Sequence, residues 1–132
     1  MNKSYLPTLT PYLTVKNAKD AITFYENAFG FVWHNKNECK EEPEHVEMSY
    51  KDAFIMFAQE GAFGGTTKAP ITLGVECSMN LYLYCDDVDA FFKNSLKHGA
   101  ISLMEPHDAF WGDRVCALKD LNGFMWMFAK KP

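Results

Sequence analysis

One pair of side chains has both the types and the spacing for chemistry. His45 and Glu47 lie two residues apart in the segment E-H-V-E-M-S-Y, residues 44–50. Because side chains alternate across a β-strand, both would point to the same side of it. An imidazole beside a carboxylate can bind a metal or move a proton, so the pair is a candidate catalytic site. The other interpretation, which we favour, is a solvent-facing pair at the open edge of a sheet.

A second candidate region is the aromatic segment H-D-A-F-W-G-D-R, residues 107–114. His107 is a weaker catalytic candidate, and we expect it in a loop that covers the site. Trp111 could stack on a planar ligand or plug the core. Arg114 is the only arginine in the chain and could bind a ligand anion or form a structural ion pair. Asp113 would point to the opposite face of the strand and is not expected to pair with Arg114.

An internal repeat supplies the elements that would position these residues. The strand pattern T-P-Y-L-T-V begins at Thr10, and N-L-Y-L-Y begins at Asn80, seventy positions further on. Each strand is followed by a polar N-cap residue, an amphipathic helical pattern and a glycine. Three further strand candidates come after each helix. They lie near 31–36, 44–50 and 53–59 in the first half, and near 101–104, 113–119 and 124–129 in the second.

The repeat predicts one α+β domain built of two βαβββ modules. Module one covers about residues 8–60 and module two about residues 79–130, with a linker over 61–78. The length of 132 residues suits a single domain. In each module the helix would cover one face of the sheet and leave the other face open.

Alternation along the strands predicts which side chains occupy the open faces. The mixture of tyrosine, methionine and amide with one carboxylate is typical of a small-molecule pocket, since a solvated face would carry more charge. A partly exposed sheet with scattered tyrosines is the alternative. The residues that we expect to bind a ligand are Tyr12, Glu47, Phe54, Met56, Asn80, Tyr82, Tyr84, Trp111, Met125 and Met127. If Glu47 is buried there, desolvation would raise its pKa and suit it to act as a general base or to pair with a cationic ligand.

Composition excludes several functional classes. With 13 basic and 17 acidic residues the net charge is −4, which gives no basic footprint for nucleic acid. The longest apolar runs are too short to cross a bilayer, so we expect no membrane partner. The start of the chain lacks the pattern of a signal peptide. The four cysteines, Cys39, Cys77, Cys85 and Cys116, show no C-x-x-C spacing, and we expect reduced thiols in a cytoplasmic protein.

Three motifs together resemble a known family. They are P-Y-L-T-V-x-x-A-x-x-A-I-x-F-Y-x-x-x-F-G, then F-W-G-D-R, then D-x-x-G-F-x-W. The sequence is similar to the glyoxalase/bleomycin resistance/dioxygenase superfamily, also called the vicinal oxygen chelate proteins, and most of all to its PhnB-like branch. The likeness runs from about Pro7 to Lys130. It implies that the two modules curl into a cup-shaped, incompletely closed mixed sheet with the helices outside, and that the chain forms a homodimer. The cup could be made within one chain or across the dimer.

The resemblance also implies where a metal would bind. Enzymes of the family hold a divalent metal with four side chains, usually His, Gln or Glu, and these positions fall on Thr10, Met56, Asn80 and Met127. A hydroxyl, an amide and two thioethers do not suit Mg²⁺, Mn²⁺, Zn²⁺ or Fe²⁺. We therefore expect no metal at the family position and no other cofactor.

Three functions remain open at this point. The first is a metal-independent protein that sequesters a small aromatic or amphipathic compound in the cup, as antibiotic-binding members of the family do. The second is a lyase, isomerase or dioxygenase-like enzyme that uses non-standard metal ligands such as His45 and Glu47, or acid–base residues alone. The third is a fold whose pocket is filled by its own side chains. The sequence favours the binding protein and does not reveal the ligand.

Overall fold

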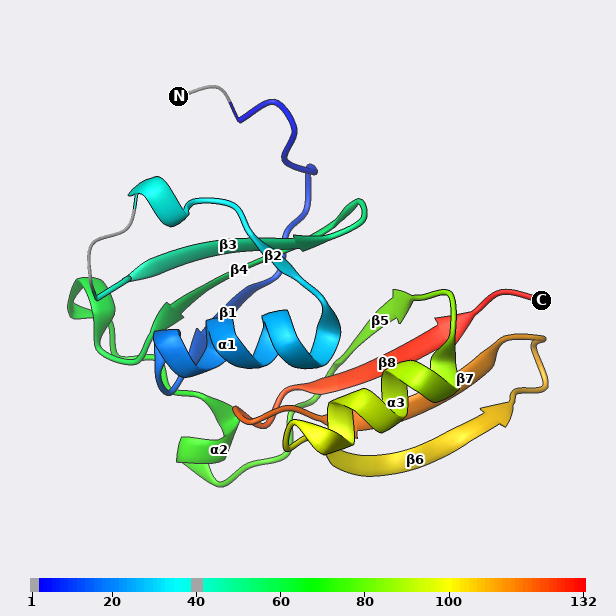
Figure 1. Ribbon diagram of the computed structural model, residues 1–132. Helices are drawn as coiled ribbons and strands as arrows, with labels where there is room; N and C mark the ends of the chain where they lie inside the picture. The colour runs from blue at the N-terminus through cyan, green and yellow to red at the C-terminus, as the bar shows by residue number, and fades with distance from the viewer. Residues whose placement is uncertain (1–2, 39–41) are drawn as a thin grey trace.

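The computed structural model describes residues 3–38 and 42–132 and contains two βαβββ modules (Figure 1). Module one consists of β1 (Tyr12–Val15), α1 (Ala18–Phe29), β2 (Val32–Trp33), the short 3₁₀ helix η1 (Lys36–Glu38), β3 (His45–Tyr50) and β4 (Ala53–Gln59). The linker carries η2 (Ala62–Gly64) and α2 (Pro70–Leu73). Module two consists of β5 (Asn80–Tyr84), α3 (Val88–Lys97), β6 (Ile101–Asp108), β7 (Arg114–Lys119) and β8 (Met125–Lys130).

Each module forms its own four-stranded mixed sheet. The strand orders are β1-β4-β3-β2 and β5-β8-β7-β6, so the two sheets have the same topology. The first strand of each module pairs in parallel with the last, and the remaining pairs are antiparallel. The α+β class and the duplicated βαβββ arrangement expected from the sequence are confirmed.

Local sequence signals fix the ends of the two main helices. The Asn17 side chain accepts a hydrogen bond from the Asp20 amide at 2.9 Å, and the Asp87 side chain accepts one from the Ala90 amide at 3.1 Å. These N-caps satisfy backbone donors that a helix leaves free in its first turn. Gly30 ends α1 with a φ of 72°, a left-handed conformation that other residues adopt at a cost.

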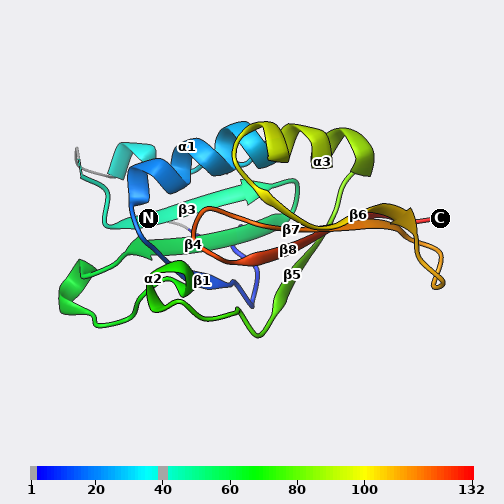
Figure 2. The same ribbon diagram turned by 90° about the horizontal axis from the view of Figure 1, so that it is seen from below.

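The modules meet through their helices and share one aromatic core. Helices α1 and α3 lie side by side, on the same side of the molecule relative to the two sheets (Figures 1 and 2). The Asn94 side chain on α3 donates to the carbonyl of Asn27 on α1 at 2.9 Å. Between helices and sheets, the Phe29 ring lies 4.9 Å from Phe128, and Phe91 lies 4.3 Å from Phe128, measured between ring centroids. The helix-covered faces therefore form the core, and the opposite faces of the sheets stay open.

Three elements differ from the sequence expectation. Strand β6 runs to Asp108 rather than ending near 104, because register shifts between Ser102 and His107 let the strand continue past a proline. Strand β2 has only two residues, because the Asn35 side chain takes over the pairing by donating to the His45 carbonyl and accepting from the Glu47 amide. Helix α2, inside the linker, was not predicted.

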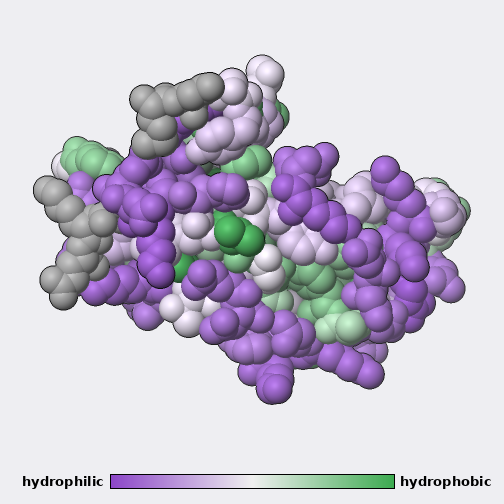
Figure 3. Space-filling view, turned by 45° about the horizontal axis from the view of Figure 1, so that its top comes forward, coloured by the Kyte–Doolittle hydropathy of each residue, from purple (hydrophilic) through white to green (hydrophobic). Residues whose placement is uncertain are grey.

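The face of the molecule seen in the space-filling view carries mostly polar residues (Figure 3). In the space-filling view, hydrophilic residues cover most of the visible face, and apolar ones show in a few patches between them (Figure 3). Within the described part of the chain, no helix is long and apolar enough to cross a membrane. Cys77, Cys85 and Cys116 are free thiols, and Cys39 lies outside the described residues.

Candidate functional site

The open face of the first sheet carries a hydrogen-bonded row of polar side chains. In the register of the sheet, Tyr12 on β1 lies beside Met56 on β4, which lies beside Glu47 on β3. The Tyr12 hydroxyl lies 2.8 Å from Nδ1 of His45, and Nε2 of His45 lies 2.8 Å from Oε2 of Glu47. With its proton on Nε2, the imidazole donates to Glu47 and accepts from Tyr12. The row can thus bind a polar group or relay a proton.

Glu47 is buried, with a relative exposure of 1%. The expectation of a solvent-facing pair is wrong for Glu47, because its carboxylate lies under Lys3, a residue of the N-terminal segment (residues 3–11). The His45 side chain remains 32% exposed. Burial by itself would raise the pKa of Glu47, but hydrogen bonds from Lys3 and His45 outweigh burial and lower that pKa. The prediction of a raised pKa was therefore wrong. Glu47 is held as a carboxylate, which suits a cation partner better than a proton donor.

One oxygen of Glu47 is left without a partner. Lys3 and His45 both donate to Oε2, whereas Oε1 is buried and accepts no hydrogen bond from the described residues. A buried carboxylate oxygen that accepts nothing is costly, and such groups are uncommon in folded proteins.

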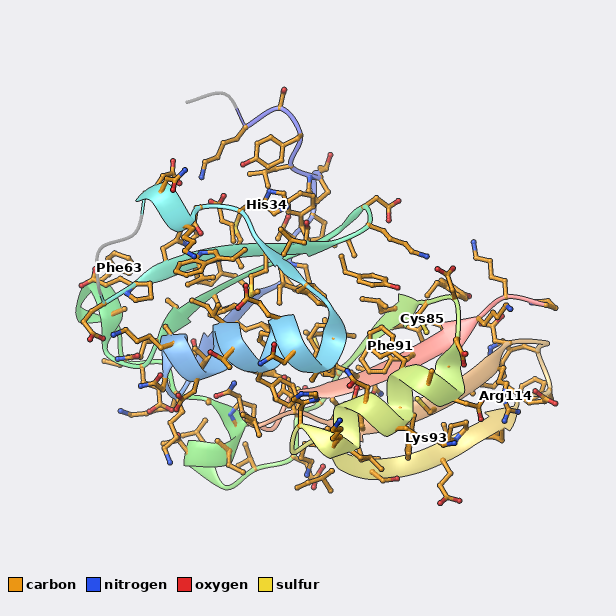
Figure 4. All side chains as sticks on the ribbon, in the orientation of Figure 1. His34, Phe63, Cys85, Phe91, Lys93 and Arg114 are labelled. Carbon is orange, nitrogen blue, oxygen red and sulfur yellow. The ribbon has the colours of Figure 1, made fainter. Side chains whose placement is uncertain are left out.

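Aromatic rings stand next to this row. Tyr5 of the N-terminal segment stacks on His34 at 6.0 Å and lies 5.7 Å from Phe54 of β4, between ring centroids. His34 in turn hydrogen bonds to Ser49 on β3. Figure 4 shows His34 close to the N-terminal segment. The first sheet therefore offers a carboxylate and an aromatic surface within one face.

The open face of the second sheet carries a different cluster, in which aromatic donors converge on Asp113. The hydroxyls of Tyr82 and Tyr84 donate to its Oδ2 at 2.8 and 2.9 Å, and the Trp111 indole donates to the same atom at 3.3 Å. Asp113 is 5% exposed, and these donors, Tyr82 first, lower the pKa of its carboxyl. Trp111 is half exposed, so it is not a core plug. Three rings are thus fixed around one carboxylate.

The four positions that the resemblance assigns to metal ligands carry Thr10, Met56, Asn80 and Met127. Met56 lies beside Tyr12, and Met127 lies beside Tyr82 and Ala117 in the second sheet. Asn80 pairs with Met125 at the start of β5, and Thr10 precedes β1. Across the described residues, no group of three or more His, Cys, Asp or Glu side chains is placed to hold a metal ion. Thioether, amide and hydroxyl donors do not fit a hard divalent cation.

A cleft joins the two modules beside these faces. Its volume is about 240 Å³, and it is lined by Phe54 of β4, Tyr82 of β5 and Leu9 of the N-terminal segment, among other residues. Predicted ligand-binding residues from both modules, Phe54 and Tyr82, therefore meet at one apolar cleft.

Two candidates from the aromatic segment lie elsewhere. His107 lies within β6, where its Nδ1 bonds to the backbone carbonyl of Glu105 at 2.9 Å, so it is not in a covering loop. Arg114 forms a two-pronged ion pair with Asp89, at 2.7 and 2.9 Å, and also contacts Asp108 at 3.0 Å (labelled in Figure 4). The sequence left two roles open for Arg114, and the structure shows the structural ion pair. As expected, Arg114 does not pair with Asp113.

Sequence reasoning missed several residues of these clusters, among them His34, Lys3, Tyr5 and Asp113. Lys3 and Tyr5 come from a segment without regular structure, and no pattern connects such a segment to a strand forty residues away. Asp113 precedes β7, and its link to Tyr82 and Tyr84 needs the strand pairing in three dimensions. The W-x-D spacing in F-W-G-D-R could have suggested it, since the tryptophan indole is a hydrogen-bond donor and a buried carboxylate needs donors.

Two βαβββ modules, packed helix to helix and each with an open sheet face, define the class of this protein. The chain belongs to the Glyoxalase/Bleomycin resistance protein/Dioxygenase superfamily, whose family model matches residues 6–128. An uncharacterized protein of Mycobacterium bovis is 30% identical over 123 residues, which cover 91% of this chain and 80% of that protein. Membership of the PhnB-like branch stays a prediction.

Solved structures share the fold. TioX from Micromonospora sp. ML1 superposes with a TM-score of 0.75 at 21% identity, over 96% of this chain and 99% of that one. The fosfomycin resistance protein FosX from Listeria monocytogenes, solved with Mn(II) and a dihydroxypropylphosphonic acid, gives a TM-score of 0.72 at 11% identity, over 100% of this chain and 93% of that one. At these identities the likeness establishes the fold alone.

Proposed function

We propose that this protein binds a small aromatic or amphipathic compound, without a metal, on the open faces of its two sheets. The observation that carries the proposal is the composition of those faces. Each presents aromatic rings around a buried carboxylate, Glu47 in one and Asp113 in the other. Apolar surface with a few placed polar groups is what small-molecule sites offer. The Met56 and Met127 side chains add soft apolar contacts at positions where relatives would hold a metal.

A homodimer belongs to the same proposal. Because the modules of one chain meet through α1 and α3, we expect a second chain to complete the cup over each open face. Tyr12, Tyr82 and Tyr84 are each more than 40% exposed, so both open faces carry accessible aromatic surface that a partner chain could cover. A second copy related by a twofold axis would lay module one of one chain against module two of its partner. The cup would then be formed twice in each dimer.

A ligand screen combined with metal analysis tests the proposed function. Aromatic and amphipathic compounds should raise the unfolding temperature, with about 2.7 kcal/mol of stabilisation at a hundredfold excess over Kd. Protein purified without chelator and offered Mn²⁺, Ni²⁺ or Zn²⁺ should bind none of them stoichiometrically. A library without any stabilising compound, or a stoichiometric transition metal, would contradict the proposal.

An enzyme is the second candidate function, and one observation favours it. The Tyr12–His45–Glu47 chain is continuous and could carry a proton in a lyase or isomerase reaction. In that case a ligand found in the screen should be converted, and Glu47→Gln should abolish turnover even at saturating ligand. Binding without conversion favours the sequestering protein.

A further inference from the structure

The surroundings of the Glu47 carboxylate favour the binding of a positively charged group. It is almost fully buried, and both groups that donate to it use the same oxygen, Oε2. The other oxygen, Oε1, is buried and accepts nothing from the described residues. A group with several N–H donors, placed over this carboxylate, could satisfy both oxygens.

The positive charge that pairs with Glu47 in this structure does not come from a helix or a strand. Lys3 belongs to the segment before β1, and its side chain is still 35% exposed. A single turn, closed by the Leu6 amide bonding to the Lys3 carbonyl at 3.0 Å, is the local structure of this segment. Releasing the Lys3 ammonium returns a long, flexible, well-hydrated side chain to water, so an incoming cation could displace it at modest cost.

The same segment also places a ring beside its ammonium. Tyr5 follows Lys3 by two residues and packs on His34 and Phe54 of module one. The segment thus presents an ammonium on Glu47 and an aromatic ring on an aromatic surface of the same module. These two features describe the chemistry that the site can accept.

We propose that the open face of module one binds an organic ammonium ion that carries an aromatic ring, and that Lys3 and Tyr5 occupy this site in the free protein. The inference rests on the proposed function and names the ligand class for one of the two faces. The ammonium would take the place of the Lys3 ammonium on Glu47, and the ring would take the place of Tyr5 against His34 and Phe54. An anionic ligand is disfavoured by the buried carboxylate, and a neutral one would leave that carboxylate without its cation.

Phenethylammonium chloride is the probe, and 2-phenylethanol is its neutral counterpart. In Lys3→Met the side-chain length is kept and the charge is removed. We expect this variant to bind phenethylammonium about tenfold more tightly than the wild type in calorimetry, because the internal competitor is gone. Lys19→Met is the matched control, since Lys19 pairs with Glu42 on the surface at 3.0 Å. It should bind the probe as the wild type does.

Two further measurements locate the effect. The double variant Lys3→Met, Glu47→Gln should lose the preference for the ammonium over the alcohol. In Lys3→Met with ¹³C-labelled glutamate, the Glu47 carboxyl resonance should shift when phenethylammonium is added. This readout does not depend on whether the Glu47→Gln protein folds well.

The outcomes separate this inference from the proposed function. Equal affinity of Lys3→Met for the ammonium and the alcohol, or no gain over the wild type, would overturn the ammonium site. The binding function would still stand if neutral aromatic compounds stabilised the protein in the ligand screen. If those compounds fail as well, the proposed function falls with the inference.

Discussion

The Tyr25 hydroxyl on α1 donates a 2.6 Å hydrogen bond to the carboxylate of Asp120, in the turn between β7 and β8. A helix of module one is thereby tied to a turn of module two. The Trp126 indole donates to the same oxygen at 2.9 Å, and the amides of Asn122 and Phe124 donate to the other one. The D-L-N-G turn is thus organised around one buried carboxylate, whose pKa is raised by burial.

Removing the Tyr25 hydroxyl should weaken this tie. Tyr25→Phe keeps the ring in the core but leaves Asp120 with one donor fewer, and the cost is expected to be about 1–3 kcal/mol of unfolding free energy. Urea unfolding followed by circular dichroism measures it. Tyr50→Phe is the control, because the Tyr50 hydroxyl makes no hydrogen bond to any of the described residues, and its effect should stay within about 0.5 kcal/mol. Equal effects of the two variants would contradict a structural role for the Tyr25–Asp120 bond.

The free energy of unfolding should depend on pH through the ionisation of Glu47. The pKa of Glu47 is lower in the folded protein than in the unfolded chain. The ionised carboxylate therefore contributes fully to the free energy of unfolding above the unfolded pKa of about 4.5, and this contribution is lost as the pH falls through the folded pKa. Between pH 7 and pH 3.5 the wild type should therefore lose more unfolding free energy than Glu47→Gln does. Chemical unfolding at several pH values tests this. Parallel pH profiles for the two proteins would show that the Lys3 and His45 contacts do not stabilise the carboxylate.

Asp113 should control the ionisation of Tyr84. The hydrogen bond to this carboxylate is the main cause that raises the pKa of the Tyr84 phenol. Asp113→Asn removes the negative charge, so Tyr84 should ionise at lower pH than in the wild type. Tyrosine-labelled ¹³C spectra during a titration resolve the change. The Tyr12 signal, in module one, should titrate as before, and a shift of every tyrosine signal would point to unfolding instead.

A charge on the open face of module two should prevent dimerisation. Tyr82→Glu places a carboxylate near Asp113 on a face that the proposed dimer covers, so sedimentation should report a monomer. Leu96→Glu alters a 38%-exposed residue on α3, outside that face, and should remain dimeric. A wild type that sediments as a monomer, or a dimer disrupted only by Leu96→Glu, would refute the proposed interface.

The fold was predictable because its signals are local and occur twice. Asn17 and Asp87 cap helices at equivalent positions, and alternation placed Leu13 and Val15 in the core, where they are buried. Each of these signals depends on the residue and its near neighbours. The extent of β6 was not predictable, because the bulges that carry it to Asp108 depend on pairing with β7.

The candidate site was predictable only in part. Tyr12, His45 and Glu47 could be placed on one face from alternation, and their hydrogen bonds agree with that placement. The direction of the Glu47 pKa shift could not be predicted, because it depends on a hydrogen bond from Lys3, which is distant in sequence and lies in no helix or strand. The sequence suggested desolvation alone, whereas the structure adds two donors that reverse the direction of the pKa shift.

The linker helix α2 packs on the D-L-N-G turn, and Gly123 makes this approach possible. Gly123 has a φ of 88°, and a Cβ there would lie 2.9 Å from the Ile71 amide nitrogen and 3.1 Å from Cβ of Pro70. The Ile71 amide donates to the Asn122 carbonyl at 2.9 Å, so the helix cannot retreat without losing this bond.

Gly123→Ala should therefore destabilise the protein in two ways. Left-handed backbone strain costs about 1–2 kcal/mol, and overpacking against α2 adds about 1–3 kcal/mol. Gly64→Ala separates the two effects, because Gly64 has a φ of 72° but an added Cβ would meet nothing within 4 Å. Urea midpoints of both variants measure the difference. If the two substitutions cost the same, the contact between α2 and the turn contributes nothing, and the linker would not help to hold the turn that organises Tyr25, Trp126 and Asp120.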